Sequence, residues 1–195
     1  VLLSDVCAGE PNCISPDNIH GGYLATQHLL ELGHRRVAYV GDEFPNDYGV
    51  PTGERRYQGY VSALEAYGVP FHADYAALGV HGEEAAYKLT QELLSLPEPP
   101  TAIFAMSDIQ AVGCMLAIRA AGLRVPEDIS VIGFDDVQLS RYVGLTTVRQ
   151  HLEQSGYLDM QTLLDMLSTP DNVQPRHLPP LELVVRQTTQ RVNTT

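Results

Sequence analysis

The chain has 195 residues, 44% of them apolar and 18% charged, so it can bury the core of one large domain or of two smaller ones. Its formal net charge of −12 argues against direct binding to a nucleic-acid backbone, which requires a basic surface. The cysteines Cys7, Cys13 and Cys114 are odd in number and lack metal-ligand spacing, which disfavours a disulfide framework, and no apolar run approaches the length of a membrane span.

Short apolar segments alternate with helical patterns along the first half of the chain. In chain order these are strand 1–5, helix 17–32, strand 37–41, helix 54–67, strand 74–79 and helix 83–95. Asp17 or Asn18 is a candidate cap for the first helix, and Gly33 is placed to end it. The segment 1–5 resembles an interior strand, so we expect the sequence to begin inside a longer polypeptide.

The second half continues the alternation with strand 101–105, helix 107–121, strand 129–134, helix 152–167 and strand 181–186. Such alternation predicts βαβ units and a parallel sheet flanked by helices, an α/β fold. Ligands of open parallel sheets bind beyond the carboxyl ends of the strands. The stretch VPEDISVIGFDD at 125–136 runs a strand into Asp135 and Asp136, which places two carboxylates at that edge.

The chain lacks the sequence motifs that are typical of several enzyme classes. No Gly-x-Gly-x-x-Gly, P-loop, His-Glu-x-x-His, Cys-x-x-Cys or Gly-x-Ser-x-Gly motif is present. Nothing pairs a nucleophile with a base, so we expect no catalytic residues, no metal site and no cofactor. An enzyme on a doubly wound fold remains a competing hypothesis that turnover assays on sugars would test.

Four polar side chains are predicted to lie on the ligand side of the sheet: Arg56, His81, Ser107 and Asp135. Arginine donors and aspartate acceptors together suit a polyhydroxylated ligand. The alternative is that Arg56 is an exposed helix-terminal charge and Asp135 a cap on the following turn. The residue pattern alone leaves both interpretations open.

The chain resembles the effector-binding core of the lactose- and galactose-repressor family of bacterial transcription regulators. The matching motifs are DNIHGGYLATQHLLELGHRRVAYVG at 17–41, ERRYQGYVSALEAYGV at 54–69, PPTAIFAMSDIQAVGCMLAIRAAGLRVPEDISVIGFDD at 99–136, LTTVRQ at 145–150 and LVVRQTT at 183–189. Each motif is modest, but their order and spacing are specific, and together they cover nearly the whole chain.

The resemblance implies a two-lobe, periplasmic-binding-protein-like fold whose amino-terminal lobe is incomplete in this chain. Residues 1–32 and 151–178 would then form part of the amino-terminal lobe. Residues 33–150 and 179–195 would form the carboxy-terminal lobe, with crossovers near Gly33, Gln150 and Pro179. In the family a DNA-binding helix-turn-helix precedes these lobes.

The resemblance also implies roles for particular residues. The effector-clamping arginine falls on Arg56 and the sugar-binding aspartate on Asp135, while an apolar pocket residue falls on Leu152. Three positions depart from the family pattern: Ser107 replaces an asparagine, His81 an aromatic side chain and His20 an acidic one. At Ser107 the pocket would lose one amide group relative to the family pattern.

The sequence therefore predicts a cytoplasmic transcription regulator that is not an enzyme, binds a sugar-like effector between two lobes and makes no contact with a membrane. Operator DNA would be bound only through a head domain absent from this chain. Helix 110–121 carries apolar residues around much of its circumference, including Met115 and Leu116, so a homodimer is expected there. The alternative is a periplasmic sugar-binding protein of a transport system, which shares the two-lobe architecture.

Overall fold

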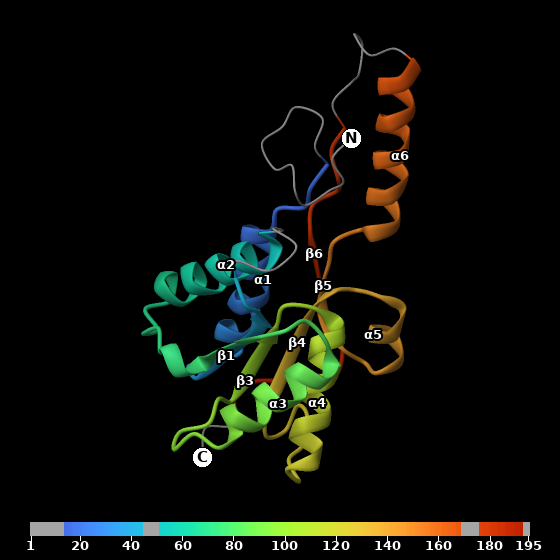
Figure 1. The fold of residues 1–195 in the computed structure, drawn as a ribbon. Coiled ribbons are helices and arrows are strands. Elements are labelled where there is room, and N and C mark those ends of the chain that lie inside the picture. The colour runs from blue at the N-terminus through green and yellow to red at the C-terminus, as the bar shows by residue number, and fades with distance from the viewer. Residues whose placement is uncertain (1–13, 45–50, 169–175, 193–195) are drawn as a thin grey trace.

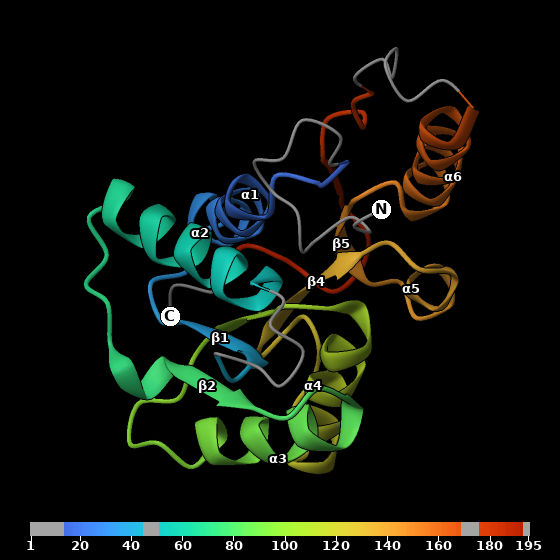
Figure 2. The same ribbon diagram turned by 45° about the horizontal axis from the view of Figure 1, so that its top comes forward.

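The computed structural model describes residues 14–44, 51–168 and 176–192, which form a six-stranded sheet flanked by helices (Figures 1 and 2). The strands are β1 (Val37–Asp42), β2 (Ala76–Gly79), β3 (Ala102–Ala105), β4 (Ser130–Asp135), β5 (Thr146–Arg149) and β6 (Glu182–Val184). The helices are α1 (Asn18–Glu31), α2 (Thr52–Ala66), α3 (Glu83–Leu94), α4 (Asp108–Ala120), α5 (Gln138–Tyr142) and α6 (Leu152–Ser168), with a 3₁₀ turn at Ala73–Tyr75. The predicted strand 1–5 lies outside the described residues.

The sheet runs in the order β2-β1-β3-β4-β5-β6, and its first five strands are parallel. This confirms the predicted α/β class, with the exception that β6 pairs antiparallel with β5. The order reverses between β1 and β3, because the chain adds β2 on one side of β1 and later strands on the other. Such a reversal opens a crevice between the carboxyl ends of the two strands, where ligands of open sheets bind.

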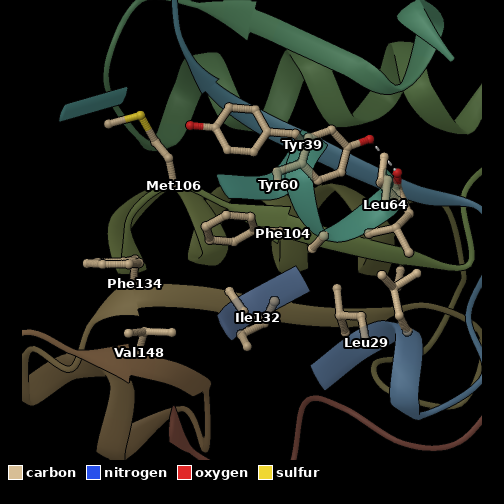
Figure 3. Packing of buried hydrophobic residues seen from close by; sticks show 14 of the residues in the cluster. Leu29, Tyr39, Tyr60, Leu64, Phe104, Met106, Ile132, Phe134 and Val148 are labelled. Atoms are coloured by element: carbon tan, nitrogen blue, oxygen red, sulfur yellow. Dashed lines mark hydrogen bonds between the residues drawn. The ribbon is translucent and has the colours of Figure 1, made fainter. Parts of the chain in front are cut away.

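Helices cover both faces of the sheet, because the strands are apolar on both sides. On one face α1 and α2 pack over a cluster that includes Tyr39, Tyr60, Phe104 and Phe134 (Figure 3). On the other face α3 and α4 pack over a second cluster around Ile103, and this cluster includes the buried thiol of Cys114. The two clusters make a three-layer core.

Two glycines let α1 and α2 approach closely. A Cβ atom added at Gly22 would lie 2.1 Å from the carbonyl oxygen of Arg56, and one at Gly59 would lie 2.1 Å from that of Ile19. Helix α1 therefore packs on the same sheet as α2. The sequence had instead placed residues 1–32 in the amino-terminal lobe and residues 33–150 in the carboxy-terminal lobe. The lobe division stays a prediction, but residues 18–31 share the core of β1–β6.

Helix α6 was predicted at 152–167, and in the structure it projects away from the sheet (Figures 1 and 2). Only Ser155 and Thr162 are buried on it, whereas several of its apolar side chains are exposed. Two further elements, β5 and α5, were not predicted as a strand and a helix. Among the described residues, no helix is long and apolar enough to cross a membrane.

Candidate functional site

Polar side chains gather at the carboxyl edge of the sheet, where β1, β3, β4 and β5 end together. Asp42 is the last residue of β1 and Asp135 the last of β4. Ser107 follows β3 and Gln150 follows β5. Parallel pairing aligns these strand ends, so residues far apart in the sequence meet at one edge.

Arg56 is the fifth residue of α2 and is 3% exposed. Its Nε donates to Asn18 Oδ1 at 2.9 Å, its Nη1 to the Met106 carbonyl at 2.6 Å, and its Nη2 lies 3.5 Å from Gln150 Oε1. The Cζ atom lies 3.7 Å from the centroid of the Phe134 ring. These contacts fix the planar guanidinium between helix α1 and the ends of β3, β4 and β5.

Asp135 faces this arginine, with Arg56 Nη1 3.5 Å from Asp135 Oδ1. Its other partner is the Gln150 amide, which donates to the same oxygen. The side chain is 18% exposed, and its backbone has a φ of 121°, which L residues rarely adopt. Burial raises the pKa of Asp135 to about 6, although the charge of Arg56 acts in the opposite direction. A carboxylate held this way keeps acceptor capacity for a ligand.

Asp136 is held differently from its neighbour. Its side chain is 1% exposed and accepts from Arg149 Nε at 2.8 Å and from Arg186 Nη2 at 2.5 Å. Burial alone would raise its pKa, but the hydrogen bonds from the two arginines outweigh burial and lower the pKa. Asp136 thus ties the end of β4 to Arg149 at the end of β5 and to Arg186 just after β6.

A second chain of hydrogen bonds runs from the end of β3 to the end of β1. Ser107 caps α4 and donates through Oγ to Gln110 Oε1 at 3.0 Å. Gln110 Nε2 in turn donates to Asp42 Oδ1 at 3.0 Å, and His81 Nδ1 lies 3.1 Å from the same oxygen. Asp108, next to Ser107, points into the protein and accepts from buried hydroxyls, so it does not line this edge.

The structure places the remaining predicted site residues in two different cavities. A cavity of about 720 Å³ is lined by Asp135 together with Leu152, Arg141 and Tyr157. His20 instead lines a separate cavity of about 250 Å³, beside Arg176 and His177. A third cavity, of about 500 Å³, is lined by Arg35 and Arg36, which directly precede β1, and so lies away from the carboxyl edge.

Of the six predicted residues, the structure brings Arg56 and Asp135 into contact and links Ser107 to His81 through Gln110 and Asp42. Leu152 shares a cavity with Asp135, and His20 does not. Asn18, Gln150 and Asp42 were not predicted as site residues. Asp42 carries the same signal that pointed to Asp135, an acidic residue at the end of an apolar strand.

The chain is similar to known proteins over most of its length. A family model described as a periplasmic binding protein-like domain matches residues 26–189. The probable HTH-type transcriptional repressor ExuR of Bacillus subtilis is 37% identical over 186 residues, which are 94% of this chain and 54% of that protein. The chain thus spans about half the length of the curated relatives that it matches.

The chain is also similar to solved structures of transcriptional regulators. A LacI-family transcriptional regulatory protein from Corynebacterium glutamicum matches with a TM-score of 0.84 and 32% identity, over 98% of this chain and 72% of its own. A LacI family transcriptional regulator from Enterococcus faecium, solved with bound ribose, matches with a TM-score of 0.83 and 31% identity, over 93% of this chain and 66% of its own. These relatives are transcriptional regulators.

Proposed function

The chain belongs to the LacI family of transcriptional regulators through its periplasmic-binding-protein-like domain, and we propose that it senses a sugar or sugar derivative and thereby controls DNA binding. DNA would be contacted by a head domain outside this sequence, because a net charge of −12 repels a polyanion. The protein would act in the cytoplasm and catalyse no reaction. The competing function is sugar binding in a periplasmic transport system. The similarity to HTH-type transcriptional repressors favours a regulator.

The contact between Arg56 and Asp135 is the observation that carries this proposal. Arg56 is almost fully buried and its donors already bind Asn18, Met106 and Asp135, so it acts by holding Asp135 in position. Asp135 and Gln150 then present acceptor and donor groups to ligand hydroxyls. Leu152 offers an apolar surface in the same cavity.

The remaining predicted residues have more distant roles in this proposal. Ser107 fixes Gln110, and His81 lies against Asp42, so both support the rim of the site. His20 would contact the effector only if closure of the two lobes brought the smaller cavity toward Asp135. The division of the lobes at residues 32/33, 150/151 and 178/179 remains part of this proposal.

Effector binding would change DNA affinity by a shift between two arrangements of the lobes. A ligand can bias such an equilibrium only if it makes different contacts in the two arrangements. Asp135 lies in the sheet and Leu152 begins the projecting helix α6, so a ligand that touches both would be sensitive to their relative position.

We assign the homodimer contact to α4. Ile109 and Leu116 on this helix are 41% and 40% exposed, which leaves apolar surface for a second copy. Met115, which was expected to contribute, is buried in its own core instead, and so is Ile118. The exposed stripe is therefore narrower than the sequence predicted.

Calorimetry on the intact protein tests the site. Arg56→Ala and Asp135→Ala are each expected to weaken sugar binding about tenfold or more, because hydrogen bonds to charged groups contribute roughly 1.5–3 kcal/mol. Asp128→Ala is a matched control, since Asp128 is paired with Arg124 away from the cavity. Unchanged affinity in both site variants, measured with D-ribose and D-glucose as probes, would refute the assignment.

A further inference from the structure

Asp42 occupies the position in the sheet where a ligand crevice is expected on topology alone. It ends β1, and the strand order reverses between β1 and its neighbour β3. The carboxyl ends of the two strands at such a reversal border a crevice. Asp42 therefore stands at the same edge as Asp135, on the far side of β3.

The environment of Asp42 fixes its carboxylate but leaves part of it open. Gln110 is fully buried, and its amide is oriented by Ser107 on one side and by Asp42 on the other. His81 lies 3.1 and 3.2 Å from the two oxygens of Asp42. The side chain remains 16% exposed. A carboxylate has about four acceptor positions, so these bonds do not exhaust its capacity.

We propose that Asp42 is a second carboxylate of the effector site and binds a sugar hydroxyl at the end of the ring opposite to the hydroxyl bound by Asp135. This inference rests on the proposed sugar-sensing function. Gln110 and His81 would position Asp42 without contacting the sugar themselves. His81 would then be a positioning residue and not a stacking surface for the effector.

The spacing of the strands agrees with this arrangement. β1 and β4 are separated by β3, which puts their ends two strand spacings apart, or about 10 Å. In a pyranose ring with bonds near 1.5 Å, the oxygens on C1 and C4 lie about 5–6 Å apart. A hydrogen bond of about 2.7 Å at each end extends this span to about 11 Å. A single sugar ring can thus reach both carboxylates.

Calorimetry with D-glucose, D-galactose and D-ribose on the intact protein, followed by deoxy analogues of the sugar that binds most tightly, tests this role. Asp42→Asn keeps the size of the side chain and an oxygen for Gln110, and it is expected to weaken binding about tenfold. Asp135→Asn serves as the comparison and Asp128→Asn as the control. Urea midpoints establish that each variant folds.

One deoxy analogue is expected to bind wild type and Asp42→Asn with equal affinity, which identifies the missing hydroxyl as the one that donates to Asp42. The analogue that is insensitive to Asp135→Asn should lack a hydroxyl at the other end of the ring. If Asp42→Asn binds as wild type does while Asp135→Asn is weakened, the role of Asp42 is overturned and the proposed function stands. If wild type binds none of the three sugars, the proposed function fails and the inference with it.

Discussion

Replacing Asp135 with asparagine is expected to stabilise the folded protein at pH 8 while it impairs ligand binding. The carboxylate is mostly buried, and its pKa is raised from 3.8 to about 6, chiefly by burial. A group whose pKa is raised by folding contributes its full stability below the unfolded pKa and loses it as the pH rises through the folded pKa. At pH 8 the native state therefore carries an ionised group in an unfavourable place.

The difference of about two pKa units corresponds to about 3 kcal/mol, at 1.36 kcal/mol per unit. Asparagine is nearly the same size, carries no charge and can still accept from Gln150. The gain should approach 3 kcal/mol at pH 8 and fall to about half of that at pH 5, where the native carboxyl group is mostly protonated. The Arg56 ion pair is already included in the pKa, so it does not reverse the sign.

Urea denaturation followed by circular dichroism at pH 8 and pH 5 measures the effect. The matched control is Asp136→Asn, the same chemical change one residue away. The pKa of Asp136 is lowered by Arg186 and Arg149 against the effect of burial, so its ionised form stabilises the fold above the unfolded pKa. This variant should lose stability at pH 8. If both variants moved the urea midpoint in the same direction, the reasoning from burial and partners would be refuted.

Three further predictions follow from packing and burial. Gly59→Ala should lower the free energy of unfolding by about 1–3 kcal/mol and weaken ligand binding, because its Cβ would meet the carbonyl of Ile19 and push α1 away from α2. Gly156→Ala is the control, since Gly156 has open space around it, and it should be neutral or slightly stabilising in a urea titration of both variants. Burial lowers the pKa of His34, so its stabilising contribution is present above pH 6.5 and is lost as the pH falls, and His34→Gln should flatten this loss between pH 7 and 5. Leu116→Asp should shift the protein toward monomer in sedimentation velocity, and an unchanged dimer would exclude the exposed stripe of α4 as the interface.

The sequence predicted most of the helices and strands because their signals are local. Periodic apolar residues, prolines and terminal glycines placed α2, α3 and α4 within a few residues of their observed bounds. The helix α5 has only five residues, too few to show a period. The packing of α1 against α2 could not be predicted either, because it depends on the close approach of Gly22 to the backbone of Arg56 in another helix.

Part of the site could be predicted because residues at strand ends share one edge of a parallel sheet. That rule correctly placed Arg56 near Asp135. It could not identify Asn18, which was considered only as a helix cap, whereas its amide oxygen accepts from Arg56, 38 residues away. Gln150 is a similar case, since it meets Asp135 only through the pairing of β4 with β5.

The burial of Arg56 distinguishes a position where substitution is costly from positions where substitution is tolerated. Its guanidinium is bound to the side chains of Asn18 and Asp135 and to the Met106 carbonyl, and it is stacked on Phe134, so replacing Arg56 removes several contacts at once. Asp42 and His81, by contrast, sit at a partly open rim. Substitutions at Asp42 or His81 can therefore change ligand specificity one residue at a time. The buried contacts of Arg56 would be preserved in such variants.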